Sequence, residues 1–124
     1  MNRKAVGSPS APTKKKANKY HNVKVTIDGI RFDSKKEARR WLELQTLLNA
    51  GKITNLERQK RYKFIINKIN CGAYVADFVY FDTEKQCEVV EDVKSKHTRL
   101  DRMYRRNRKM MKAIHGIEIT EVVY

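Results

Sequence analysis

Two acids and a lysine fall on one face of a predicted β-hairpin that spans residues 74–94. Most residues on either side of the polar stretch 82–86 are β-branched or aromatic, which is typical of two strands joined by a turn. A loop of two or four residues places Asp77 directly opposite Asp92, with Cβ atoms roughly 5 Å apart. Lys94 follows on the same face, about 6.5 Å further along. A loop of three or five residues would break this pairing.

This arrangement could hold a metal ion. Two like charges in a cross-strand pair are destabilising, and a divalent cation between Asp77 and Asp92 removes the repulsion. Glu91 falls on the opposite face with Phe78, so Asp92 is the preferred second ligand. The alternative is a half-buried sheet that carries acids at its solvent-exposed end. A buried acid pair with Lys94 on otherwise apolar strands favours a functional site.

Charge points to a polyanionic partner. The chain has 124 residues, 40% of them hydrophobic, and a formal net charge of +14. This length suits one domain with one core, and nucleic acid is the first candidate partner for so basic a domain. An acidic membrane surface is a weaker alternative. The sequence has no apolar run of the ~20 residues that a spanning helix needs, and no signal peptide is expected.

The cysteines and the N-terminal segment fit an intracellular basic protein. Cys71 and Cys87 lack metal-site spacing and are expected to be free thiols in a reducing cytoplasm, with a disulfide as the alternative. Residues 1–21 are rich in basic residues and contain no acid, so they are expected to form a disordered basic arm. The arm either contacts phosphates or keeps the protein soluble. Residues 22–124 form the predicted domain.

The first half of the domain is predicted to contain a hairpin and a helix. Alternating residues flank Asp28-Gly29, a strong hairpin pattern, between 23 and 32. A helix is expected to start at Ser34 and to end at Gly51. Its predicted core stripe is Ala38, Trp41, Leu42, Leu44 and Leu48.

Glu37 has two interpretations in this helix. In the capping-box pattern that begins at Ser34, Glu37 occupies the third helical position and would bond back to the Ser34 backbone. Glu37 also lies one turn before Trp41 on the stripe that faces the sheet, so it could reach a metal site. Spacing alone favours the cap.

The remaining elements are less regular. Residues 53–63 are predicted to form a polar connection, with a basic cluster that includes Arg58 and Gln59 beside a strand at 62–66. A turn at 67–72 leads into the central hairpin. The last strand is expected at 117–123. With a helix on each face of the sheet, this order predicts an α/β sandwich.

The second predicted helix has a one-sided charge distribution. It begins near Thr98 and Asp101 and stops at Gly116, with an apolar seam of Leu100, Met103, Met110 and Ile114. Its other side is basic, which favours a phosphate-binding surface over simple solvation. The expected nucleic-acid contacts are Arg58, Gln59, Lys96, His97, Arg99, Arg102, Arg105, Arg106 and Lys109.

These residues resemble the PD-(D/E)xK, or restriction-endonuclease-like, nuclease superfamily. The matching elements are a helix bearing Glu37, a strand bearing Asp77, and the D-x-K element Asp92-Val93-Lys94. The segments SxxEARR, YVADF and VVEDVKSK are similar to a family of small phage-encoded proteins, some relatives of which resolve branched DNA, including Holliday junctions. The resemblance covers residues 22–124 and departs from the motif name at Ala76, where proline is expected.

The resemblance implies a mixed β-sheet flanked by two helices, with an N-terminal β-hairpin, and a DNA endonuclease. It implies Mg²⁺ or Mn²⁺ held by Asp77, Asp92 and the Val93 carbonyl, with Glu37 as a further ligand. Lys94 would orient or deprotonate the attacking water and stabilise the developing charge. A homodimer is expected by analogy, because cuts in two strands need two active sites.

A second function class remains open. A nucleic-acid-binding module without catalysis, such as a degenerate nuclease or a packaging or ribosome-associated protein, explains the charge equally well. It leaves Asp77, Asp92 and Lys94 unexplained.

Overall fold

The computed structural model describes residues 24–95 and 101–124, so the predicted arm at 1–21 lies outside the described residues. The chain separates into two units, one ending at Ala38 and one beginning at Arg39. The first contains an antiparallel hairpin of β2 (Val25–Ile27) and β3 (Ile30–Phe32). Its turn residues Asp28 and Gly29 have positive φ angles of 50° and 80°, as a two-residue hairpin turn requires. The predicted hairpin is confirmed.

Helix α2 (Lys35–Asn49) begins and ends where local chemistry predicts. The Glu37 amide donates to Ser34 Oγ at 3.2 Å, and Gly51, with φ 76°, follows the last turn. Leu44 is fully buried, but Leu42 is 50% exposed, so its assignment to the core stripe was wrong. These leucines are two positions apart, which is about 200° around a helix, so they point in nearly opposite directions.

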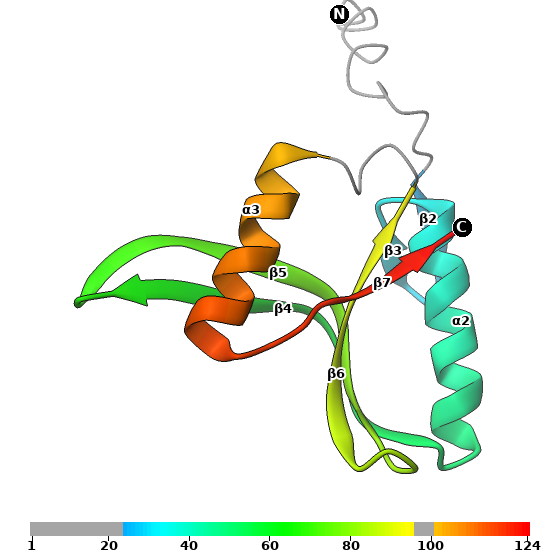
Figure 1. Cartoon of the computed structure of the whole chain (residues 1–124). Coiled ribbons are helices and arrows are strands. Elements are labelled where there is room, and N and C mark those ends of the chain that lie inside the picture. Colours follow the sequence, from blue (N-terminus) through cyan, green and yellow to red (C-terminus); the bar gives the residue numbers. More distant parts are fainter. Residues whose placement is uncertain (1–23, 96–100) are drawn as a thin grey trace, which may run out of the picture. The chain divides into compact units, whose positions relative to one another are not determined.

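The second unit contains a mixed sheet in the order β4-β5-β6-β7 (Figure 1). Its strands are β4 (Ile53–Ile66), β5 (Ile69–Asp82), β6 (Cys87–Lys94) and β7 (Thr120–Val123). The β4–β5 and β5–β6 pairs are antiparallel, and β7 is parallel to β6. The fold class is therefore confirmed as α/β, with a four-stranded mixed sheet and two helices.

Two predictions about β4 were wrong. The segment 53–63 is part of a long edge strand, not a connection, because its backbone pairs with β5 even though many of its side chains are charged and exposed. The following turn contains only Asn67 and Lys68, which have φ angles of 51° and 68°, and the residues from Ile69 onward already belong to β5.

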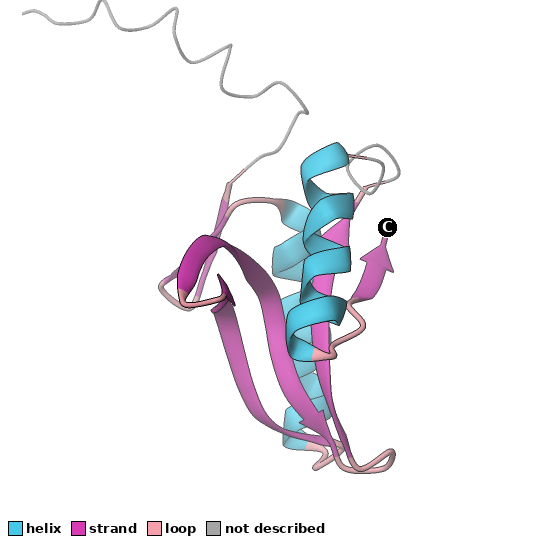
Figure 2. Ribbon diagram, turned by 60° about the vertical axis from the view of Figure 1, so that its left-hand side comes forward, coloured by secondary structure: helices cyan, strands magenta, loops and turns pink. Residues whose placement is uncertain are grey.

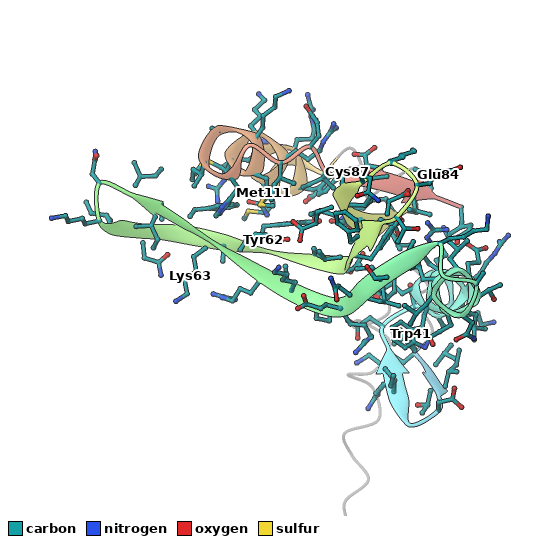
Figure 3. The ribbon with its side chains drawn as sticks, turned by 90° about the horizontal axis from the view of Figure 1, so that it is seen from below. Trp41, Tyr62, Lys63, Glu84, Cys87 and Met111 are labelled. Carbon is teal, nitrogen blue, oxygen red and sulfur yellow. The ribbon has the colours of Figure 1, made fainter. Side chains whose placement is uncertain are left out.

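The two helices cover opposite faces of the sheet. On one face, the Trp41 ring of α2 stacks on Phe78 with centroids 6.1 Å apart. On the other, α3 (Arg102–Met110) and the wider helical turn η3 (Met111–His115) pack on the strands (Figures 2 and 3). The buried cluster on this face consists of Tyr62, Phe64, Tyr74, Ala76, Val79, Val90, Tyr104, Met111 and Ile119.

The alternation of β5 changes at Asp77. Ala76 and Val79 both belong to the cluster beneath α3, although strict alternation would put them on opposite faces. On β4, Gln59 lies between the partners of Ala76 and Phe78 and has a φ of 53°, which interrupts the regular pairing. The strands bend in this region (Figures 1 and 2).

The predicted seam of the second helix is confirmed in part. Met110 and Ile114 pack against the buried cluster, as predicted, and Leu100 and Thr98 lie outside the described residues. Met103 is 58% exposed, so its assignment was wrong, and the buried Tyr104 and Met111 were missed. A tyrosine in a run of basic residues is a weak marker of a buried face. The stop at Gly116 is confirmed, with φ 68°.

Removing the N-cap of α3 is expected to destabilise the protein modestly. The Asp101 side chain accepts a hydrogen bond from the Tyr104 amide at 3.1 Å. Asp101→Ala should lower the free energy of unfolding by about 1 kcal/mol, because an amide of the first turn loses its acceptor. Urea unfolding measures the loss, and Asp101→Asn should keep most of the stability. Equal losses of stability in both variants would show that Asp101 stabilises the helix through its negative charge and not through the capping hydrogen bond.

Candidate functional site

The register of the central hairpin is the predicted one. The loop contains four residues, 83–86, and Phe78 pairs with Glu91. Asp77 and Asp92 occupy the next positions, where the backbone pairs end. There the Asp77 carboxylate accepts a hydrogen bond from the Val93 amide at 2.7 Å. The side chain of Asp77 thus ties β5 to β6 at the point where the strands bend.

Asp92 is buried and has two close partners. Its side chain is 7% exposed; Oδ2 accepts from the Tyr74 hydroxyl at 2.6 Å, and Oδ1 lies 3.2 Å from Lys94 Nζ. Burial raises the pKa of Tyr74, and the charge of Asp92 raises it further, so this hydroxyl stays protonated and donates. Lys94 was predicted to lie on the same face as Asp92, and the ion pair shows that the two side chains do meet there.

Lys94 also contacts the second helix. Its ammonium lies 4.1 Å from the centroid of the Tyr104 ring. The Tyr104 hydroxyl donates to Glu121 at 2.8 Å, and Arg108 lies 3.3 Å from the same carboxylate. Glu121 is the partner of Asp92 across the parallel β6–β7 pair. One chain of contacts therefore runs from Asp92 through Lys94 and Tyr104 to β7.

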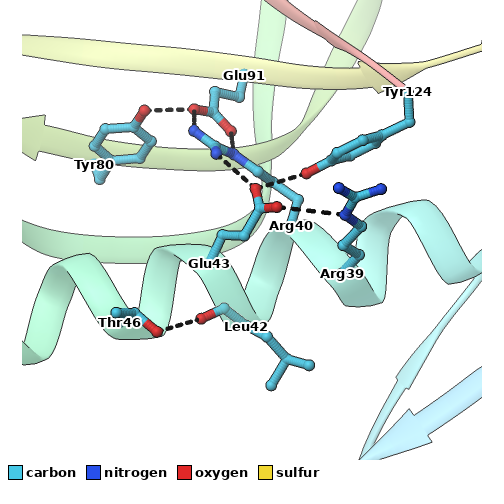
Figure 4. A network of polar contacts seen from close by, with 8 residues as sticks. All are labelled: Arg39, Arg40, Leu42, Glu43, Thr46, Tyr80, Glu91 and Tyr124. Carbon is cyan, nitrogen blue, oxygen red and sulfur yellow. Dashed lines mark hydrogen bonds and ion pairs between the residues drawn. The ribbon is translucent and has the colours of Figure 1, made fainter.

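Glu91 lies on the opposite face, as predicted, in a network with α2 (Figure 4). It is 1% exposed, and Arg40 binds both of its oxygens, at 2.9 Å through Nε and 2.6 Å through Nη2. The Tyr80 hydroxyl also donates to Glu91. Arg40 and the Tyr124 hydroxyl in turn contact Glu43, at 3.0 and 2.7 Å. The hydrogen bond from Tyr124 and the one from Arg40 lower the pKa of Glu43.

The other predicted site residues are placed as follows. Glu37 lies in the first turn of α2, in the first unit, whereas Asp77, Asp92 and Lys94 lie in the second. Arg58 lies on the α2 side of β4, 6.0 Å from the centroid of the Trp41 ring, and is partly buried, while Gln59 is exposed. Lys96, His97 and Arg99 lie outside the described residues, and Arg102, Arg105, Arg106 and Lys109 are exposed on α3.

A preformed cage of metal-binding side chains is not seen. Within residues 24–95 and 101–124, no three or more histidine, cysteine, aspartate or glutamate side chains converge as a metal site would require. The donors brought together at the end of the β5–β6 pair are the carboxylates of Asp77 and Asp92. Cys71 and Cys87 are free and exposed. In the part of the chain that the structure describes, no helix is long and apolar enough to cross a membrane.

Three residues of the site were missed by sequence reasoning. Tyr74, Tyr104 and Glu121 hold Asp92 and Lys94 from β5, α3 and β7. The alternation of the last strand could have placed Glu121 on a sheet face, but only the parallel β6–β7 pairing aligns it with Asp92. Tyr74 and Tyr104 were read as part of a strand and of a basic helix, not as hydrogen-bond donors.

Stability is expected to fall above about pH 10. Burial raises the pKa of Tyr62 to about 12 from its usual 10.0, and it also raises the pKa values of Tyr74, Tyr80 and Tyr104. The folded protein therefore binds more protons than the unfolded chain above pH 10, and its stability decreases as pH rises through that range. Urea unfolding at pH 8 to 11.5 measures the decrease.

Tyr62→Phe is the matched variant for this prediction, because the buried Tyr62 hydroxyl has no hydrogen-bond partner among the described residues. Its stability should decline less steeply with pH than that of the wild type. If the stability of Tyr62→Phe decreased with pH as steeply as that of the wild type, the raised pKa of Tyr62 would not contribute to the decrease.

Comparison with known proteins finds one family. The sequence model of the family described as "Protein of unknown function (DUF1064)" matches residues 17–120. No curated protein and no solved structure matches the chain.

Proposed function

The chain belongs to the DUF1064 family, whose model matches most of its length, and we propose from its own geometry that it is a divalent-metal-dependent endodeoxyribonuclease. It would hydrolyse phosphodiester bonds at the end of the β5–β6 pair, with branched DNA as the preferred substrate. The proposal rests on residues that the fold gathers there, Asp77, Asp92 and Lys94, and on the basic surface of α3.

One observation carries the proposal, the buried carboxylate of Asp92 in contact with a lysine. Removing a charged pair from water costs on the order of several kcal/mol per ion. A protein with an apolar pair of similar volume at the same position is often at least as stable. The sheet would therefore not need Asp92 and Lys94 for its stability. Their position beside Asp77, at an interruption of the backbone pairing, supports a chemical role.

The donor set fits Mg²⁺ or Mn²⁺. Both ions prefer hard oxygen ligands, and Mg²⁺ commonly binds one or two carboxylates and keeps several waters. Asp77, Asp92 and the Val93 carbonyl would hold the ion. When bound, the ion supplies Lewis acidity and aligns the phosphodiester for in-line attack.

The protein residues have separate roles in this proposal. Tyr74 donates to Asp92 and keeps its carboxylate in one orientation. Lys94 neutralises Asp92 before the ion binds, and its ammonium, held over the Tyr104 ring, would then orient the attacking water and stabilise charge on the phosphate. Glu121 positions Lys94 through Tyr104.

The exposed face of α3 supplies the proposed phosphate contacts. Within the described residues, Arg102, Arg105, Arg106 and Lys109 make no ion pair, whereas Arg108 pairs with Glu121 and Lys112 with Glu118. Cations without carboxylate partners favour binding to a polyanion. Tyr104, on the same helix, contacts Lys94, so α3 connects the basic surface directly to the candidate site.

A cleavage assay on a panel of DNA substrates tests the function. The panel contains single-stranded, duplex, flap and four-way-junction DNA with Mg²⁺, Mn²⁺ or EDTA, and each reaction is run beside Asp92→Ala. We expect metal-dependent cleavage by the wild type that the variant lacks. Cleavage by both proteins at equal rates would exclude this site.

A second candidate, a nucleic-acid-binding module without catalysis, is favoured by a different observation. Lys94 already balances the charge of Asp92, and residues 24–95 and 101–124 contain no group of three potential metal-binding side chains. Binding that survives EDTA, without cleavage in either metal, would favour this module.

A further inference from the structure

The distal part of the β4–β5 hairpin carries apolar side chains that the core does not use. In Figure 1 this end of the hairpin extends past α3. Tyr62 and Phe64 are buried against the cluster beneath α3, but the side chains beyond them are exposed. The exposed ones are Ile65 at 47%, Ile66 at 40% and Ile69 at 64%. Large apolar side chains gathered on a protruding turn mark an interaction surface.

The hairpin turn holds these isoleucines in a fixed arrangement. Ile66 pairs with Ile69 across a two-residue turn, and both turn residues, Asn67 and Lys68, have positive φ angles. Such turns match the twist of the two strands, so the tip is a narrow, well-defined ribbon end. Ile65, Ile66 and Ile69 together are called the apolar tip here.

The charge around the apolar tip points to a polyanion. Residues 60–76 contain Lys60, Arg61, Lys63 and Lys68 and no acid. Lys63 lies on the side of the strands away from α3 (Figure 3). A second copy of this basic hairpin would be repelled, and lysines on an edge strand such as β4 oppose strand pairing with another chain. Nucleic acid is therefore the favoured partner.

We propose that the distal β4–β5 hairpin is a DNA-binding arm whose apolar tip inserts where base stacking is interrupted. Proteins that insert apolar side chains between bases must unstack them, and this cost is smallest where stacking is already broken. The lysines would contact the flanking phosphates. The arm thus selects DNA with a bulge or a branch point, and its role in choosing the cleavage site rests on the proposed nuclease function.

Binding in EDTA tests the arm without any cleavage. The probes are a duplex with a three-nucleotide bulge, labelled with 2-aminopurine beside the bulge, and the same duplex without it. The wild type should bind the bulged duplex more tightly and increase the fluorescence of the unstacked 2-aminopurine. The double variant Ile66→Ser/Ile69→Ser should lose this increase and roughly tenfold of its affinity for the bulged duplex.

Two matched variants separate the apolar tip from other effects. Leu42→Ser removes a 50% exposed apolar side chain on α2 and should bind both probes like the wild type. Lys63→Ala/Lys68→Ala should weaken binding to both probes by similar factors, because both duplexes offer the phosphates that these lysines would contact. Circular dichroism of each variant confirms that it is folded.

Several outcomes would overturn the inference. The inference is wrong if Ile66→Ser/Ile69→Ser keeps the wild-type preference for the bulged duplex and the wild-type increase in fluorescence. It is also wrong if the apolar tip is needed only for binding to vesicles of anionic phospholipid, which would make it a membrane contact. Failure of the nuclease proposal is distinguishable: the wild type would then show the bulge-dependent fluorescence in EDTA but no cleavage in Mg²⁺.

Discussion

Asp92→Asn is expected to slow DNA cleavage by about 1000-fold, which is the upper end of what one electrostatic contact at a reacting centre contributes. Asparagine has nearly the same size and can still accept from Tyr74, so the fold is preserved. The change removes the negative charge that would hold the metal ion and leaves Lys94 without its partner. Single-turnover cleavage of the preferred substrate measures the loss.

Asp82→Asn is the matched control for this prediction. Asp82 ends β5, where its carboxylate accepts hydrogen bonds from the amides of Glu84 and Lys85 at 3.0 Å. The same chemical change in the same strand pair, away from Asp77 and Lys94, should leave the cleavage rate within about twofold of the wild type. Similar losses in both variants would mean that the carboxylates act through the stability of the hairpin and not through catalysis.

Arg40→Ala is expected to lower the free energy of unfolding by about 3–5 kcal/mol, because it leaves Glu91 buried without its bidentate partner. Glu91 is 1% exposed, and among the residues that the structure describes only Tyr80 would continue to donate to it. The contact with Glu91 raises the pKa of Arg40, so the guanidinium stays charged at neutral pH. Urea unfolding at pH 7 measures the difference.

Arg39→Ala provides the comparison within the same helix. The Arg39 side chain is 66% exposed, and its ion pair with Glu43 spans 3.4 Å at the surface. Exposed pairs contribute about 0–1 kcal/mol, so this variant should lose much less stability. Adding Glu91→Gln to Arg40→Ala should restore part of the loss, since the buried charge is gone. Equal losses for Arg39→Ala and Arg40→Ala would contradict the account of the Glu91 network.

Features set by local chemistry were predictable from the sequence. The Asp28-Gly29 turn, the Ser34 cap and the Gly51 stop each depend on residues adjacent in the chain. The same holds for the four-residue loop, which fixed the register between β5 and β6 and so brought Asp77 beside Asp92. Strand alternation then placed Lys94 on the correct face.

Features that depend on distant pairing were not predictable. The charged segment 53–63 becomes a strand only because β5 pairs with it, and its own residues carry little β preference. Tyr104 and Glu121 reach the site through the packing of α3 and the parallel β6–β7 pair, which no short-range pattern encodes. The buried Arg40–Glu91 pair was missed for the same reason, because it joins α2 to a strand far along the chain.

Titration of Mn²⁺ into the metal-free protein tests most directly whether Asp77 and Asp92 form a metal site. Isothermal calorimetry of the wild type should show saturable binding, and Asp77→Asn and Asp92→Asn should each weaken it by at least tenfold, because each removes a charged oxygen ligand. Asp82→Asn should bind like the wild type. Unchanged Mn²⁺ binding in the Asp77 and Asp92 variants would contradict the account.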